Sequence, residues 1–135
     1  MRYVLDTTAF SAAMRRDADL LRMLREYPPG DIVTVPPVVA EIQYGIERLD
    51  SSSKKYFLLK SEKDRLLSII NLLPWSSESS DHFGKIKADL ERRGKLIDDF
   101  DVAIAAIAMA HKCGVITGNL NHFQRVKNIE CKSWK

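Results

Sequence analysis

Carboxylates in three distant segments of the chain stand at the borders of apolar stretches, where they could perform chemistry. Asp6 ends the run "YVLD", Glu41 lies within "TVPPVVAEIQYG", and Asp101 leads "DVAIAAIA". A carboxylate at the edge of a packed core must be hydrogen-bonded, paired with a cation or bound to a metal. Asp101 raises this question most strongly, because the apolar segment that it leads has no basic residue before His111.

Each acid also has a purely structural explanation. Asp6 could be the N-cap of a following helix, since an aspartate there accepts hydrogen bonds from free backbone N–H groups. Glu41 could complement the helix dipole from the first turns of its own helix. Asp98 and Asp99 directly precede Asp101, and either can cap the apolar helix.

If the three carboxylates meet at one place, they would repel each other by several kcal/mol unless a cation lies among them. Hard oxygen ligands favour Mg²⁺ or Mn²⁺ over zinc. An ion held in this way orients and activates a water against a phosphodiester and neutralises charge as the bond breaks. No histidine is expected in the acidic cluster, so metal and carboxylate would activate this water.

The elements that must position these acids are strands alternating with helices. Strands are expected at residues 3–5, 31–35, 72–76, 115–117 and 129–134. Helices are expected at residues 8–14, 18–24, 36–49, 53–71, 79–93, 101–113 and 119–124. Pro74 favours an edge position for its strand. The alternation predicts a three-layer α/β/α sandwich with a central, mainly parallel sheet.

In such a sheet, ligands bind beyond the carboxyl ends of the strands. Asp6 follows the first expected strand, and Glu41 lies near the start of the helix after the second. Gly118 and Asn119 follow the strand "VIT". We therefore expect all of these residues at one edge of the sheet.

Composition narrows the class of protein. The chain has 135 residues, of which 45% are hydrophobic, and we expect a single domain over residues 1–135. No apolar stretch is long enough to span a membrane. The two cysteines lack metal-ligand spacing, which argues against a zinc site or a disulfide framework and favours the cytoplasm. A net charge of +3 is compatible with a nucleic-acid partner without arguing for one.

Four motifs in order resemble those of PIN-domain proteins, and among them the VapC-type toxins of prokaryotic toxin–antitoxin pairs. They are "YVLDTTAF", "TVPPVVAEIQYGIERL", "GKLI" with "DVAIAAIA", and "VITGNLNHFQRV". Each motif alone is weak, but their order and spacing over nearly the whole chain make the resemblance specific.

The resemblance implies a Mg²⁺-dependent endoribonuclease, with Mn²⁺ as a possible substitute, that is the toxin of a type II toxin–antitoxin module. It makes Asp6, Glu41 and Asp101 the metal-binding acids. The supporting residues would be Thr7 beside Asp6, Thr117 within the acidic cluster, and Asn119 where other members carry Asp or Asn. The implied partners are an RNA substrate, a small VapB-like antitoxin and a second copy of the chain.

Several roles stay open at this point. Asp98 or Asp99 either joins the metal site or only caps the helix, and we expect capping. The basic residues Arg92, Arg93 and Lys95 approach the same edge, either as a solvated helix face or as contacts to RNA phosphates. The competing functions are a non-catalytic PIN-like module that binds RNA or protein, and an RNA-processing or flap nuclease that uses the same acids.

Overall fold

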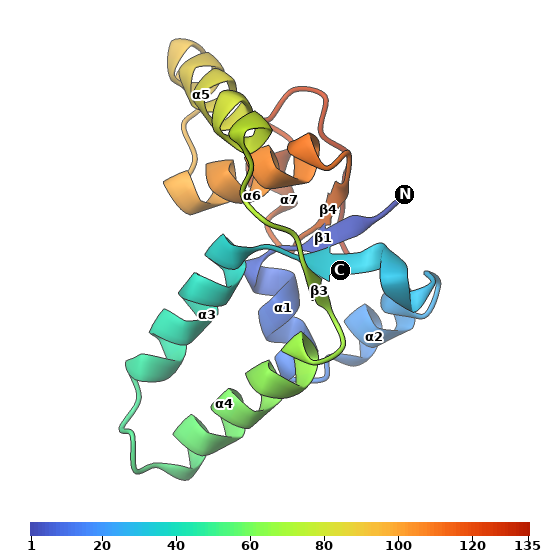
Figure 1. Ribbon diagram of the computed structural model, residues 1–135, viewed down its shortest axis with the longest axis vertical. Coiled ribbons are helices and arrows are strands. Elements are labelled where there is room, and N and C mark those ends of the chain that lie inside the picture. Colours follow the sequence, from blue (N-terminus) through green and yellow to red (C-terminus); the bar gives the residue numbers. More distant parts are fainter.

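A five-stranded, entirely parallel sheet in the order β3-β2-β1-β4-β5 runs through the middle of the protein (Figure 1). The computed structural model describes all residues from 1 to 135. The strands are β1 (Tyr3–Leu5), β2 (Ile32–Thr34), β3 (Asn71–Leu72), β4 (Gly114–Ile116) and β5 (Cys131–Lys132). All five expected strands are present, and the sheet has β3 at one edge and β5 at the other.

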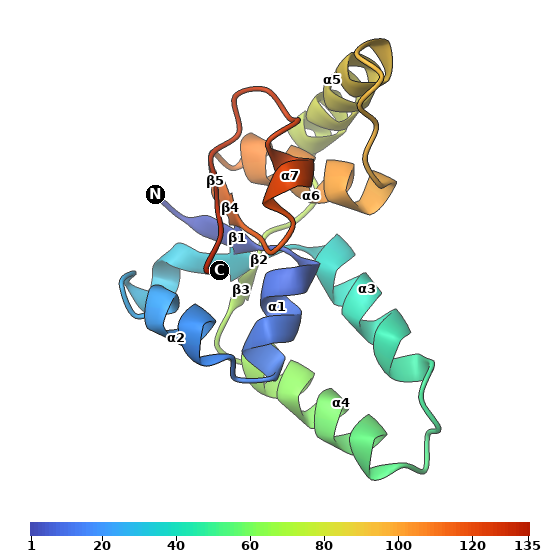
Figure 2. The ribbon, with the colours of Figure 1, turned by 180° about the vertical axis from the view of Figure 1, so that it is seen from behind.

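Helices cover both faces of this sheet. They are α1 (Thr7–Met14), α2 (Ala18–Leu24), α3 (Pro36–Glu47), α4 (Lys54–Leu67), α5 (Ser77–Arg92), α6 (Asp99–Ala110) and α7 (Leu120–Phe123), with a 3₁₀ turn η1 (Pro29–Asp31) before β2. Figures 1 and 2 show α1 to α4 on one side of the sheet and α5, α6 and α7 on the other. The expected three-layer α/β/α sandwich is confirmed.

The helix starts follow local sequence signals. Asp6, Asp17 and Asp98 cap α1, α2 and α6 with their side chains, and Ser76 begins α5 with a capping box. Pro36 and Pro37 open α3. Backbone N–H groups in the first turn have no acceptor within the helix, so the absence of a proline N–H there costs no hydrogen bond. Several boundaries differ from expectation, most of all the end of α4 at Leu67 and the end of β3 at Leu72, before Pro74.

Helix α6 lies at the centre of the upper layer. Its residues from Val102 to Ala108 are all buried, and α5 packs along it. Alanine at four of these seven positions lets the neighbouring elements approach the helix closely. The start of α6, with Asp98 and Asp101, is thereby held firmly beside the sheet.

The chain reverses its direction of winding between β1 and β4. From β1 it proceeds through β2 to the β3 edge, and from β4 it proceeds to the β5 edge. Leu5 pairs with Ile116 in the parallel register, so Asp6 and Thr117 leave the sheet side by side. Such a switch point is where open α/β sheets bind ligands.

No helix is both long and apolar enough to cross a membrane.

Candidate active site

Asp6 is a buried carboxylate at the end of β1, with 1% of its surface exposed. Its Oδ1 accepts hydrogen bonds from Thr8 Oγ1 at 2.6 Å and from the Ala9 backbone N–H at 2.9 Å. Its Oδ2 accepts from Thr117 Oγ1 at 2.5 Å. Asp6 is therefore the helix cap that the sequence predicts, and it also presents a carboxylate at the switch point.

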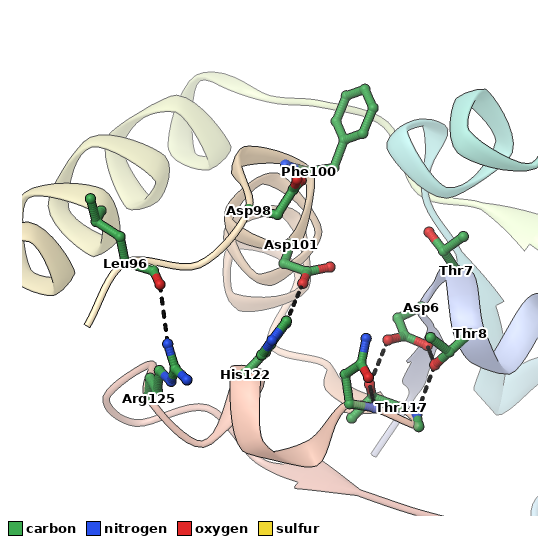
Figure 3. Close-up of polar contacts among 12 residues, drawn as sticks. Asp6, Thr7, Thr8, Leu96, Asp98, Phe100, Asp101, Thr117, His122 and Arg125 are labelled. Atoms are coloured by element: carbon green, nitrogen blue, oxygen red, sulfur yellow. Dashed lines mark hydrogen bonds and ion pairs between the residues drawn. The ribbon is translucent and has the colours of Figure 1, made fainter. Parts of the chain in front are cut away.

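Thr117 and Thr8 connect the two strands at this point (Figure 3). Thr117 Oγ1 accepts from the Asn119 backbone N–H at 2.8 Å, and Thr8 Oγ1 accepts from the Gly118 backbone N–H at 2.7 Å. The hydroxyls thus hold the loop after β4 against Asp6. The predicted hydrogen bond of Thr117 within the acidic cluster is confirmed.

Glu41 reaches the site from α3. Its Oε1 accepts a hydrogen bond from Thr7 Oγ1 at 2.5 Å. The expectation that Thr7 supports Asp6 is wrong: the neighbouring Thr8 does so, because consecutive residues at the start of α1 point in different directions. Thr7 therefore binds an acid of α3, and Thr8 binds the cap.

Asp101 projects from the first turn of α6 toward the ends of β1 and β4 (Figure 3). Its Oδ2 lies 3.0 Å from His122 Nδ1 at α7, and the Asp101 side chain is 14% exposed. Asp98 Oδ1 accepts from the Phe100 backbone N–H at 2.8 Å and caps the helix. The expectation that no histidine meets the acidic cluster is wrong.

The electrostatics show that the three acids share one environment. Burial is the largest effect on each, and it raises the pKa values of Asp6, Glu41 and Asp101 above their ordinary values. The charge of Asp101 raises the pKa of Asp6 and of Glu41 further. Hydrogen bonds with the threonines and with His122 lower the pKa values of these acids and so partly offset the effect of burial.

As placed, the side chains do not close into a cage of direct ligands. No three histidine, cysteine, aspartate or glutamate side chains converge on a common metal position. Asp101 Oδ1 and Glu41 Oε2 nevertheless have no hydrogen-bond partner in the protein. Such free oxygens fit a hydrated Mg²⁺ or Mn²⁺ ion, because Mg²⁺ keeps several waters and needs only one or two carboxylates. The donor set is therefore compatible with the expected ion.

Other predicted site residues lie outside this cluster or have other partners. Asp99 pairs with Lys87 at 3.0 Å, and its side chain is 64% exposed. Arg93 binds Asp89 and the Arg125 carbonyl oxygen, so it ties α5 to the segment after α7. Arg92 lines a different hollow, between α5 and the end of α6. The Asn119 side chain makes no hydrogen bond, and Lys95 is exposed.

His122 is a residue of the acidic cluster that the sequence reasoning missed. It lies three residues after Asn119, in the segment "NLNHF" that follows the carboxyl end of β4. That position places it at the same edge as Asp6. The buried Phe123 next to it anchors α7 in the core.

Comparisons with known proteins agree with this geometry. The PIN domain model matches residues 3–129. The chain belongs to the PIN-domain family.

Relatives and solved structures within this PIN-domain family span the whole chain. Ribonuclease VapC2 of Rickettsia felis is 29% identical over 136 residues, covering 99% of this chain and 98% of its own. Ribonuclease VapC2 of Haemophilus influenzae is also 29% identical, over 135 residues with the same coverage. The crystal structure of VapBC2 from Rickettsia felis, bound to a DNA fragment from its promoter, matches with a TM-score of 0.87 and 27% identity over 100% of both chains.

The buried charge of Asp101 predicts a pH-dependent effect of the Asp101→Asn substitution. The native state binds the Asp101 proton more tightly than the unfolded chain, because its pKa is raised above 3.8. The contribution of Asp101 to the stability of the wild type is therefore lost as the pH rises from about 4 through the raised pKa, and the variant does not share this loss. Urea unfolding without divalent metal should show that the stability of Asp101→Asn relative to the wild type increases from pH 4 to pH 7. If the stability of the variant relative to the wild type instead decreases from pH 4 to pH 7, this account is contradicted.

Thr117 offers a test of how the site is held. Thr117→Val removes the hydroxyl that donates to Asp6 and accepts from Asn119, leaving a buried carboxylate with one donor fewer. We expect the free energy of unfolding to fall by about 1–3 kcal/mol. Thr117→Ser, which keeps the hydroxyl, is the matched control and should restore most of this loss. Equal stability of the Val and Ser variants would show that the hydroxyl has no such role.

Proposed function

We propose that the protein is a metal-dependent endoribonuclease, the VapC-like toxin of a type II toxin–antitoxin module. The observation that carries this proposal is the gathering of three acids from separate elements at one switch point. The charge of Asp101 raises the pKa values of Asp6 and Glu41, and the His122 side chain lies within hydrogen-bond distance of Asp101. The similarity to VapC ribonucleases over 99% of the chain supports the same function.

Asp6, Glu41 and Asp101 would hold Mg²⁺, or Mn²⁺ in its place. When bound, this ion supplies an activated water and neutralises charge at a phosphodiester. Thr117 and Thr8 fix the Asp6 carboxylate, and Thr7 fixes Glu41. His122 positions Asp101 by holding one of its oxygens, so that the other faces the remaining acids.

The proposed substrate is RNA, and the proposed inhibitor is a small VapB-like antitoxin. Two solved structures that resemble this chain at 25% identity or more are VapBC assemblies from Rickettsia felis and Haemophilus influenzae. We propose that this chain likewise pairs with an antitoxin and works as a homodimer. It would act in the cytoplasm, where RNA is available and its two free cysteines stay reduced.

Cleavage of RNA by the purified protein tests the proposal. We expect cutting of a single-stranded or loop-containing RNA with Mg²⁺ or Mn²⁺ and none with EDTA. Asp101→Asn and Glu41→Gln should abolish cutting while circular dichroism shows an intact fold. Asp99→Asn is the matched control, because this exposed neighbour pairs with Lys87 outside the cluster, and it should cut like the wild type.

The outcomes separate the proposal from its rivals. Cutting by Asp101→Asn at the wild-type rate would point to a contaminating nuclease and contradict the assignment. A wild type that binds RNA but does not cut it with either metal would indicate a non-catalytic PIN-like module. Preferred cutting of branched DNA over RNA would indicate a flap nuclease.

A further inference from the structure

A polar cavity of about 420 Å³ adjoins the acidic site on the side of α1. Its walls include Thr7 and Thr8, whose hydroxyls bind Glu41 and Asp6. The remaining walls come from α1, the residues just after it and the end of the chain: Ser11, Arg15, Asp17, Trp134 and Lys135. The cavity thus begins one residue away from the buried carboxylate of Asp6.

Trp134 forms an aromatic wall of this cavity. The chain after β5 descends toward α1 and α2 (Figure 2), and this path brings Trp134 onto the loop that follows β4. Gly118 has no side chain there: a Cβ atom would lie 3.1 Å from Trp134 Cη2 and 3.1 Å from Thr8 Oγ1. The indole is partly exposed, so one region of its surface faces the cavity while another packs on the protein.

Two cations border the same cavity. Arg15 donates from Nη1 to Ser11 Oγ at 2.9 Å, which holds its guanidinium on the wall. Lys135 Nζ lies over the Trp134 ring, 5.7 Å from its centre, so a base that stacks on this face displaces the ammonium group toward the neighbouring phosphate. The one acid, Asp17, accepts two backbone N–H groups at the start of α2, so the helix N-terminus offsets its charge. The cavity therefore favours an anionic ligand.

The geometry points to a nucleotide-binding subsite, in which a base of single-stranded RNA stacks on Trp134 and a phosphate binds Arg15 and Lys135. This inference rests on the proposed ribonuclease function and names the path of the substrate beside the cleaved bond. An aromatic face beside cations is the arrangement by which proteins bind single strands without reading the sequence. The expected basic residues Arg92 and Arg93 lie at the carboxyl end of α5 instead, where Arg93 is already paired with Asp89.

Binding of a fluorescein-labelled, 12-nucleotide single-stranded RNA tests the subsite. Measuring anisotropy in EDTA separates binding from cleavage. We expect Trp134→Ala to weaken binding about tenfold, since loss of one stacked base typically has an effect of this order. Trp134→Phe should retain most of the affinity, and Arg15→Gln should weaken binding and reduce its dependence on salt.

Trp75 provides the matched control. It is 45% exposed and binds Ser80 on the opposite layer, so Trp75→Ala should bind RNA like the wild type. A 12-nucleotide oligomer with abasic ribose at every position should bind the wild type as weakly as the normal RNA binds Trp134→Ala. Wild-type affinity in Trp134→Ala, or equal binding of the abasic and normal oligomers, would overturn the proposal.

A second measurement covers the case in which Trp134→Ala does not fold. In Trp75→Phe, Trp134 is the sole remaining indole, and RNA should quench its fluorescence by stacking. Absence of quenching at saturating RNA would overturn the subsite. The proposed function is tested by a separate result. If the wild type cuts RNA with Mn²⁺ and Asp101→Asn does not, that function stands, and a negative binding result rejects only the subsite.

Discussion

Concentration of negative charge at the switch point between β1 and β4 is the constraint on which this structure depends. Asp6 is almost fully buried, and the charge of Asp101 raises its pKa further. The charges of Asp101 and Asp6 likewise raise the pKa of Glu41. The fold tolerates this charge through hydroxyl donors, a helix N-terminus and one histidine. Each of these groups lowers the cost of a carboxylate without neutralising the cluster. A divalent ion would complete the compensation, so instability of the metal-free site and affinity for the metal have the same origin.

The strands and helices around this charge could be predicted from the sequence, because they depend on local sequence signals. Short β-branched and apolar runs marked the five strands, and capping residues such as Asp17 and Ser76 marked helix starts. Alternation of these elements then required a parallel sheet with helices on both faces. The edge at which Asp6 and Thr117 meet follows from the register of β1 and β4. Boundaries were less predictable: α4 ends at Leu67, four residues before the expected end at residue 71.

Partners of individual side chains were not readable, because they depend on packing between distant elements. The motif "DTT" does not show which threonine faces the cap and which faces α3, and the expected assignment to Thr7 was wrong. His122 meets Asp101 only because the buried Phe123 seats α7 beside α6. Likewise, Arg93 looked available in the sequence, yet the fold pairs it with Asp89. A cavity of about 520 Å³, lined mainly by apolar residues, lies between α1, α2 and α4, away from the acids.

The most direct test of the central idea is a crystal of the protein soaked in Mn²⁺, with the ion located by its anomalous scattering. Our account predicts a single strong peak within ligand or one-water distance of the free oxygens of Asp101 and Glu41 and near Asp6 Oδ2. Crystals of Asp101→Asn treated in the same way should lack it. A peak elsewhere, or none among these side chains at saturating Mn²⁺, would contradict the account.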